Sequence, residues 1–346
     1  MSVLSVKTRC LEGFDDPRVG RERWNGLLQA GSSPLVFLTW EWQHAWWQSF
    51  GRGQLLLMAA EANGELVALA PFFTEAGMIY FVGSGGSDYL DFIGQTAEAE
   101  VVEALLEAAR QSVPDFIGFV LYHLPESSPN RLRVERAARK LGLAFFEEGE
   151  LAAPALEWSD QPEAALAAAN KKSLVRHERY FSREGRLDVG HWRRGEEIRP
   201  QLEEFFAQHQ ARWQHTPFPS LFCDQAQCAF YQRLTTVAAE TGWLRFTRID
   251  WNGRAIAFHF GFSYRRRFLW YKPSFDLSLA RHSPGEVLLR QLLLAAVEEG
   301  AHTFDFGLGE EGFKSRFANR VHKVLTLGAY APSALPTPAA AEGEQR

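Results

Sequence analysis

Two stretches in the last quarter of the chain combine residue types that could bind an anion and stabilise developing negative charge. In the first, Ser283 suits a helix N-cap, Pro284 suits the first helical position, and Glu286 completes an S-x-x-E capping box. The amides at such a helix start lack intrahelical partners, so this end favours a bound pyrophosphate. A helix that is only well capped is the alternative. The residues predicted to contact the anion are Arg281, His282, Ser283, Gly285 and Glu286.

The second stretch is FDFGLGEEGFKSRF, residues 304–317. Asp305 stands between two phenylalanines on a predicted strand, so its carboxylate faces away from their rings and needs a partner or a chemical role. The glycines that follow predict a tight turn leading to Lys314 and Arg316. This order is typical of a strand end that borders a cleft, although Asp305 could equally be a structural partner of an arginine.

A larger α/β framework must position both stretches. Apolar periodicity and turn residues predict the elements of its first half. Asn63-Gly64 joins two apolar runs and is a strong hairpin signal, because both residues tolerate positive φ. A proline-containing segment at 145–158 leads into the second half. The helices predicted in the first half span 18–30, 39–51, 97–111 and 129–142, and the strands span 55–73 (the hairpin), 78–83 and 115–124.

The second half repeats this order of elements. Its hairpin turns at Asn252-Gly253, and the segments NGELVA (63–68) and NGRAIA (252–257) share the same turn and apolar alternation. A duplicated fold is the natural inference, since coincidence of two common hairpins does not explain the shared order of the later elements. The predicted helices are 161–184, 196–213, 224–241 and 284–299, and the predicted strands are 243–263 (the hairpin), 268–275 and 302–307.

Length and composition indicate two α/β domains of an ordinary globular protein. A chain of 346 residues with 46% hydrophobic residues exceeds the usual size of one domain. We expect domains at 1–150 and 151–330, followed by a disordered Pro/Ala-rich tail at 331–346. The net charge of −5 gives no general attraction to nucleic acid or anionic membranes.

Cysteine and histidine usage argues against disulfides and metals. The three cysteines form no CxxC pair, and the ten histidines form no HExxH motif, so we expect no metal site. No secretory signal and no apolar run long enough to span a bilayer are evident, which favours a cytoplasmic location.

Three other features of the sequence each allow a structural or a functional interpretation. Four tryptophans within 40–47 are either packing residues or a sugar-stacking wall. Cations within 171–186, Arg176 among them, are either a solvated helix face or a site for an acidic acceptor or a CoA 3′-phosphate. The glycine-rich segment 84–88 suggests a flexible cleft edge, with Asp88 and Asp91 as acceptor contacts.

The ordered combination of these segments resembles the CelD-like acetyltransferases of the GNAT superfamily. The resemblance rests on Tyr271, on Ser-Pro-Gly before an apolar helix, on Asp305-Phe306, on Gly309-Glu310 and on Phe313-Lys314. Segments 82–94 and 170–185 also look like family segments, so the resemblance covers roughly residues 20–328. The chain departs from the superfamily pattern in having a loop poorer in glycine and basic residues before the helix.

This resemblance implies two tandem GNAT-like domains and an acetyl-CoA or other acyl-CoA donor held at the start of the apolar helix. Similarity to the Fem-type aminoacyl transferases assigns Lys314 the stabilisation of the oxyanion, an effect of about 3 kcal/mol per donor. Asp305 is then the candidate for accepting or orienting the acceptor proton, and Tyr271 for protonating the leaving thiolate or orienting the donor. Acceptor contacts are expected from Asp88, Asp91, Arg176 and Arg316.

The sequence thus predicts direct acyl transfer to an amine or hydroxyl of a sugar or cell-envelope precursor. No GxSxG or Cys/His nucleophile signature suggests a covalent intermediate. Two alternatives stay open. One is an aminoacyl-tRNA donor, which the acidic net charge disfavours without excluding, and the other is a non-catalytic glycan- or peptide-binding module on the same fold.

Overall fold

The computed structural model describes residues 6–33, 35–214 and 216–334, whose contacts separate into two units. The first unit contains residues up to 33, residues 52–150 and residues from 325 onward, and the second contains 34–51 and 151–324. Residues 34–51 and 325–330 therefore group with the opposite half from the one expected from their place in the sequence. From residue 335 onward, the tail predicted to be disordered lies outside the described residues.

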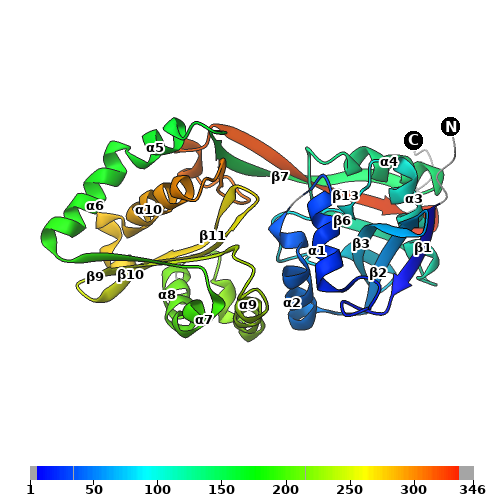
Figure 1. The fold of residues 1–346 in the computed structure, drawn as a ribbon, viewed down its shortest axis with the longest axis horizontal. Helices are drawn as coiled ribbons and strands as arrows, with labels where there is room; N and C mark the ends of the chain where they lie inside the picture. Colours follow the sequence, from blue (N-terminus) through cyan, green and yellow to red (C-terminus); the bar gives the residue numbers. More distant parts are fainter. Residues whose placement is uncertain (1–5, 34, 215, 335–346) are drawn as a thin grey trace, which may run out of the picture. The chain divides into compact units, whose positions relative to one another are not determined.

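The first unit is a sheet with helices packed on it (Figure 1). Its elements are β1 (Val6–Leu11), α1 (Gly20–Ala30), β2 (Gln54–Ala62), β3 (Glu65–Glu75), β4 (Met78–Phe81), β5 (Ile93–Gly94), α3 (Ala99–Gln111), β6 (Gly118–Pro125), α4 (Asn130–Lys140), the start of β7 (Ala144–Glu157), the end of β13 (Arg320–Tyr330) and η6 (Pro332–Ala334). The strands follow the order β1-β2-β3-β4-β6-β13-β7, with β5 paired to β3. Helix α3 contacts α4 and strands β1 to β3.

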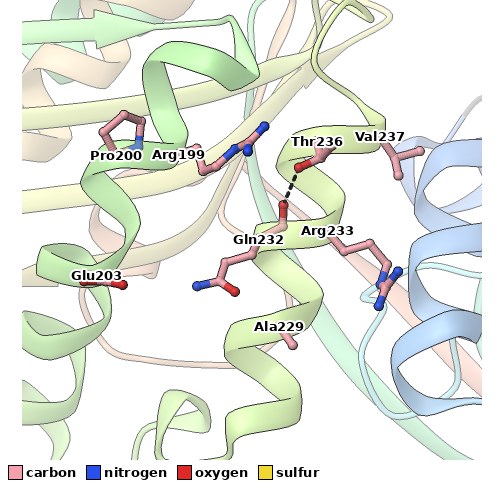
Figure 2. A pocket seen from close by; sticks show the side chains of 8 residues that line it. All are labelled: Arg199, Pro200, Glu203, Ala229, Gln232, Arg233, Thr236 and Val237. Carbon is pink, nitrogen blue, oxygen red and sulfur yellow. Dashed lines mark hydrogen bonds between the residues drawn. The ribbon is translucent and has the colours of Figure 1, made fainter.

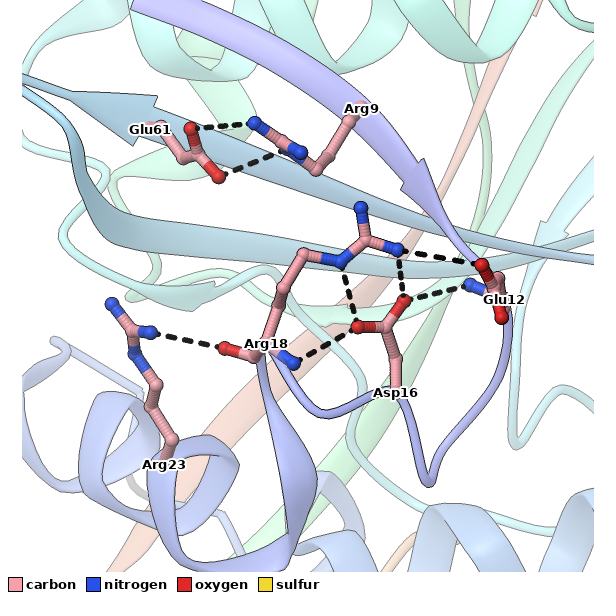
Figure 3. Close-up of polar contacts among 6 residues, drawn as sticks. All are labelled: Arg9, Glu12, Asp16, Arg18, Arg23 and Glu61. Atoms are coloured by element: carbon pink, nitrogen blue, oxygen red, sulfur yellow. Dashed lines mark hydrogen bonds and ion pairs between the residues drawn. The ribbon is translucent and has the colours of Figure 1, made fainter.

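A buried carboxylate organises the loop between β1 and α1 (Figure 3). Asp16 accepts hydrogen bonds from the backbone amides of Glu12 and Arg18 and pairs with the Arg18 guanidinium at 2.7 Å. The hydrogen bond with Arg18 is the main reason why the pKa of Asp16 lies far below its ordinary value. Across the neighbouring β1–β2 pair, Arg9 forms an ion pair with Glu61 at 2.9 Å. These contacts fix the entry into α1.

The second unit also pairs a mixed sheet with helices. Its elements are η1 (Val36–Leu38), α2 (Trp40–Phe50), the end of β7, α5 (Glu163–Ala169), α6 (Lys172–Glu184), β8 (Leu187–Trp192), α7 (Gly195–Ile198), η2 (Arg199–Gln201), α8 (Leu202–Trp213), η3 (Leu221–Cys223), α9 (Gln225–Val237), β9 (Leu244–Trp251), β10 (Arg254–Tyr264), β11 (Arg267–Phe275), η4 (Leu277–His282), α10 (Pro284–Glu298), β12 (Thr303–Asp305), η5 (Lys314–Arg316) and the start of β13. The strand order is β7-β12-β11-β10-β9-β8.

Helices cover both faces of this second sheet (Figure 1). Helix α10 packs on β10 and β11 and contacts α5 and α6, whereas α8 packs on β11 from the other side. The apolar run that suggested a buried helix explains this position, because Val287, Leu288, Leu292 and Leu293 are fully buried. A helix that is apolar on most of its surface is stable only when surrounded.

Both Asn-Gly hairpins predicted from the sequence are confirmed. Strand β2 pairs with β3 around Asn63-Gly64, and β9 pairs with β10 around Asn252-Gly253. All four turn residues have positive φ, between 52° and 83°, as a two-residue turn of this type requires.

The segment expected to be a connection between the halves is instead strand β7, which contributes to both units. Phe304 and Asp305 of β12 pair with Leu156 and Ala155 of β7. Pro154 cannot donate to the sheet, but its carbonyl accepts a hydrogen bond from the Phe306 amide. The exposed glutamates of this strand hide the apolar alternation that would have indicated it.

Two buried histidines make the second unit sensitive to acid. Burial is the main reason why the pKa values of His209 and His259 fall to about 3. Below about pH 6.5 the two histidines are protonated in the unfolded chain but stay neutral in the folded unit. The free energy of unfolding therefore falls as the pH drops from 6.5 towards 3. We expect urea unfolding to show a loss of up to about 1.4 kcal/mol per pH unit for each histidine in that range.

Replacing His259 with a ring that does not titrate tests this account. His259→Phe keeps an aromatic ring against Phe268 and Trp270, which lie 6.0 and 5.7 Å from the His259 ring. The slope of unfolding free energy between pH 6 and pH 4 should then become shallower than in the unmodified protein. An unchanged slope would show that the pKa of His259 is the same in the folded and the unfolded chain.

Candidate functional site

A cavity of about 270 Å³ lies in the second unit at the start of α10. It is formed by the end of α8, the end of β11, the η4 segment, the first turn of α10 and the 313–317 turn. Most of its lining is apolar, and few polar groups converge on it, which is typical of small-molecule sites. The lining residues are Arg212, Trp270, Pro273, Phe275, Leu277, Ala280, Ser283, Gly285, Glu286, Leu289, Phe313 and Phe317.

The predicted capping box at the start of α10 is wrong. Ser283 adopts the left-handed conformation, with φ 54° and ψ 61°, and its side chain makes no capping hydrogen bond. Glu286 turns away from the helix start and forms an ion pair with Arg316 at 3.1 Å. Since a capping box would have used two backbone donors, its absence leaves the helix start more open to a ligand than expected.

The backbone amide of Gly285 is the donor that remains. The amide of Ser283 is bonded to Ala280 and that of Glu286 to the Ser283 carbonyl, whereas no acceptor for the Gly285 amide occurs in the part of the chain that the structure describes. A Cβ at this position would lie 3.0 Å from the Phe275 ring. Glycine is therefore required for the cavity to reach the amide.

Glu286 contributes an acceptor. Its Oε2 atom is buried and has no hydrogen-bond partner among the described residues, although His177 lies 3.7 Å away. Burial lowers the pKa of His177, so this histidine adds little positive charge at neutral pH. Arg316 is thus the group that neutralises Glu286 and limits its repulsion of an anion.

Arg212 is a candidate functional residue that the sequence did not indicate. It lines the cavity, donates a hydrogen bond to the Pro273 carbonyl at 2.8 Å, and lies over the Phe275 ring at 4.2 Å. Within residues 6–33, 35–214 and 216–334 it makes no ion pair with a carboxylate. Burial lowers the pKa of Arg212 to about 10, an effect partly offset by the nearby charge of Glu311. A partly buried guanidinium without a carboxylate is suited to an anionic ligand.

Tyr271 lies on the opposite face of the sheet from the cavity. Its ring packs against Phe37, Trp42 and Phe262, with centroid distances of 5.2 to 5.9 Å. Its neighbour Trp270 lines the cavity instead, because consecutive side chains of a strand point to opposite faces. The predicted role of Tyr271 in protonating the leaving group therefore has no contact with the cavity to support it.

Asp305 is fully buried and uses both carboxylate oxygens within the fold. One oxygen pairs with Arg267 at 2.9 Å, and the other accepts a hydrogen bond from the Gly307 amide at 2.8 Å. This geometry holds the turn that leaves β12, which is the structural alternative raised by the sequence. Asp305 is not among the residues that line the cavity.

Lys314 is buried, and its ammonium group is fully engaged. Nζ donates to the Leu308 carbonyl at 2.7 Å and pairs with Glu311 at 2.7 Å. The side chain thus closes the 308–314 turn, while the adjacent Phe313 ring reaches the cavity. To stabilise an oxyanion, as predicted, the ammonium would have to leave the Leu308 carbonyl.

Truncation of Lys314 should destabilise the protein. Lys314→Ala removes a buried charged donor that holds the Leu308 carbonyl, so we expect a loss of about 2 kcal/mol in unfolding free energy. Glu311→Gln removes only the ion pair, whose carboxylate is more than half exposed, and should cost less than about 1 kcal/mol. Urea unfolding of both variants gives the comparison. Equal stability of Lys314→Ala and the unmodified protein would contradict the structural role.

The remaining predicted residues lie in two different places. Arg281 donates to His282 at 2.8 Å, and the His282 ring stacks on Tyr180 with centroids 3.8 Å apart. These two, like the exposed Arg176 on α6, do not line the cavity.

Asp88 and Asp91 belong to the first unit. Asp91 is fully buried and accepts hydrogen bonds from Ser33, Ser128 and Asn130, and burial raises its pKa despite these bonds. Its two oxygens are thus satisfied by the fold, which leaves Asp88 as the more accessible of the two predicted acceptor contacts.

A larger and more open cavity of about 810 Å³ lies between the η2–α8 segment and α9 (Figure 2). Its lining mixes apolar side chains with the charged residues Arg199, Glu203 and Arg233. Arg233 donates to the Gln48 side chain at 2.7 Å. None of the sequence-predicted residues lies there, and it offers no free helix start or enclosing aromatic wall. The smaller cavity is therefore the better candidate site.

Neither a metal-binding cluster nor a membrane-spanning helix occurs among the described residues. No group of three or more His, Cys, Asp or Glu side chains is placed to hold a metal ion within residues 6–33, 35–214 and 216–334. In the same part of the chain, no helix combines the length and hydropathy that a membrane span requires.

Comparison with known proteins identifies the fold. Residues 168–315 match the family model described as acetyltransferase (GNAT) domain. The structure of FemX resembles this chain with a TM-score of 0.67 at 10% identity, covering 90% of this chain and 96% of FemX. A tandem GNAT protein from the clavulanic acid biosynthesis pathway has a TM-score of 0.50 at 12% identity, covering 96% and 100%.

A third structure is the C-terminal DUF2156 domain of a protein named as a lysylphosphatidylglycerol synthetase, from Agrobacterium fabrum. Its TM-score is 0.55 at 14% identity, with 92% of this chain and 93% of that chain covered. No curated protein matches the chain by sequence. The mixed α/β architecture with tandem GNAT-like domains is thereby confirmed, together with a structural relation to FemX, whereas the narrower CelD-like assignment stays a prediction.

Proposed function

We propose that this chain is an acyltransferase that takes an acyl-CoA thioester as donor and acylates an amine or hydroxyl of a sugar or cell-envelope precursor in the cytoplasm. The observation that carries the proposal is the cavity at the start of α10, whose lining residues except Phe317 belong to the segment that matches the acetyltransferase (GNAT) model. Its polar groups are of two kinds, donors for an anion or carbonyl and one free acceptor.

The chemistry of the cavity suits the thiol end of such a donor. Gly285 offers an amide and Arg212 a guanidinium, while Glu286 Oε2 can accept the N–H of an amide-containing arm. Trp270, Phe275 and Phe313 supply apolar walls. A volume of about 270 Å³ is below that of typical drug-sized sites, so the cavity suits an acyl group and part of its arm, with the nucleotide outside.

The proposed reaction is direct transfer. The acceptor nitrogen or oxygen attacks the thioester carbonyl, a C–N or C–O bond forms, and the C–S bond breaks to release the CoA thiolate while the acceptor loses its proton. Donors fixed near the carbonyl stabilise the intermediate oxyanion in a dry site. Lys314 stays our candidate for that task, although its ammonium closes the 308–314 turn, whereas Asp305 and Tyr271 do not line the cavity and are given no part in this step.

Release of free thiol tests the proposal. Purified protein is incubated with acetyl-CoA or longer acyl-CoAs and a panel of amino sugars and hydroxyl acceptors, and CoA release is followed with a thiol reagent. We expect acceptor-dependent release, and a CoA concentration of 100 times Kd should stabilise the fold by about 2.7 kcal/mol. Absence of both stabilisation and release would favour the non-catalytic binding module.

A second candidate donor is an aminoacyl-tRNA. It is favoured by exposed cations on α6, since Lys172, Arg176 and Arg179 make no ion pair with a carboxylate among the described residues. The same helix reaches the cavity region, where Ser173 accepts a hydrogen bond from Arg316. Donor binding that weakens steeply with salt would support this candidate, because each phosphate contact releases counterions.

A further inference from the structure

Four aromatic side chains share one face of the sheet in the first unit. They come from adjacent strands in the order β4, β6, β13 and β7. Two of them are among the most exposed large apolar residues of the described chain, at 36% for Tyr122 and 45% for Phe146. We call this set the aromatic face; its members are Tyr80, Tyr122, Tyr330 and Phe146.

The rings of the aromatic face are in contact in pairs. Tyr80 and Tyr122 are nearly parallel, with an interplanar angle of 12° and centroids 6.3 Å apart. Tyr330 and Phe146 lie 6.1 Å apart. Aromatic side chains that are exposed together in this way are unusual on a protein surface, and clusters of them commonly mark binding sites.

Two glycines allow the Tyr330 ring to lie directly on the sheet. A Cβ at Gly118 on β6, or at Gly328 on β13, would come within 2.6 Å of this ring. The hydroxyl of Tyr330 donates to Glu148, which fixes the ring in place. Its orientation is thus set in advance, and a ligand that stacks on it does not have to order it.

Carboxylates dominate the charge around the aromatic face. Glu148 lies on the same side of β7 as Phe146, because the two are separated by one residue of the strand, and Glu75 ends β3 next to β4. The guanidinium of Arg52 approaches Glu75 only to 3.9 Å. A polyanion such as nucleic acid, anionic lipid or a uronic acid chain would therefore meet like charge.

We propose that the aromatic face is a binding site for an oligosaccharide of neutral or amino sugars. The C–H faces of pyranose rings stack on aromatic rings, and sugar hydroxyl or ammonium groups donate to carboxylates such as Glu148. The site is independent of the proposed transferase activity, because all its residues belong to the first unit and the cavity belongs to the second. Stacking on the aromatic rings and hydrogen bonding to the nearby carboxylates together select the sugar ligand.

Calorimetric titration of the full chain tests this site with three probes: cellohexaose, a chitosan hexamer and hexagalacturonate. We expect binding of cellohexaose or the chitosan hexamer and none of hexagalacturonate. Tyr122→Ala and Phe146→Ala should each weaken binding at least about fivefold, since each removes a stacking ring. Tyr330→Phe keeps the ring and should retain most of the affinity.

The matched control is Phe218→Ala, which removes a 74% exposed ring from the second unit and should leave sugar binding unchanged. Melting temperatures of all variants show whether the fold is kept. Binding of neither neutral nor amino sugars would overturn the proposal, as would equal affinity of Tyr122→Ala, Phe146→Ala and the unmodified protein. Preferential binding of hexagalacturonate, or a self-association that Phe146→Ala abolishes, would assign the surface to another occupant and overturn it as well.

Discussion

Replacing Arg212 with methionine should weaken binding of an anionic acyl donor by about 10- to 100-fold while leaving the fold as stable as before or more so. A charge-assisted hydrogen bond contributes about 1.5 to 3 kcal/mol, which gives the expected loss. The opposite effect on stability follows from burial, since a guanidinium without a carboxylate is costly to keep out of water. Methionine keeps much of the contact with Phe275.

The two readouts are calorimetric titration with acetyl-CoA and urea unfolding of the free protein. Arg233→Met is a matched control, because Arg233 also bonds a neutral oxygen, that of Gln48, but lines the other cavity. This control should bind the donor like the unmodified protein. Unchanged donor affinity in Arg212→Met would remove Arg212 from the site.

Replacing Gly285 with valine should reduce donor affinity by about 100-fold or more. The added Cβ would lie 3.0 Å from the Phe275 ring, and the two methyl groups would occupy the space in front of the Gly285 amide. The φ angle of Gly285 lies outside the left-handed region, so valine is compatible with the backbone, and the expected effect is on the cavity rather than on folding.

Gly26→Val is the corresponding control. Gly26 is a helical glycine of the first unit whose Cβ would meet no atom within 4 Å. Thermal unfolding of both variants and titration with acetyl-CoA separate an effect on the cavity from a general effect of valine. If Gly285→Val bound the donor normally, the amide at the start of α10 could not be its contact.

Much of the framework could be predicted from the sequence because local physics specified it. The two Asn-Gly turns need positive φ at both residues, and the apolar run after Ser-Pro-Gly needs burial on most sides. These signals indicated the duplicated α/β order that the structure has. Strand β7 was missed because its middle, EEGE, is exposed and lacks alternation.

The residues of the cavity were harder to predict because distant segments create it. Arg212 looked like an ordinary cation in the last turn of a helix. The available signal was the absence of a carboxylate three or four residues away, which indicates an arginine that needs a partner elsewhere. Trp270 was passed over in favour of Tyr271, and a shift of one residue along a strand moves the side chain to the other face.

The prediction of a capping box at Ser283 was wrong for a related reason. The S-x-x-E pattern reports only local preference, whereas Glu286 finds a stronger partner in Arg316, thirty positions along the chain. A long-range contact likewise engages Asp305 with Arg267, whereas Lys314 is engaged within its own turn by the Leu308 carbonyl. Charged residues in a turn can be located from sequence, but their partners cannot.

Hydrogen–deuterium exchange with and without saturating acetyl-CoA tests the central claim most directly, because it reports which backbone amides a ligand protects. The account predicts slower exchange in peptides that cover 270–289 and 308–317. Peptides that cover the second cavity, 199–237, should be unchanged except at the end of α8. Protection confined to 199–237, with no change around Gly285, would contradict it.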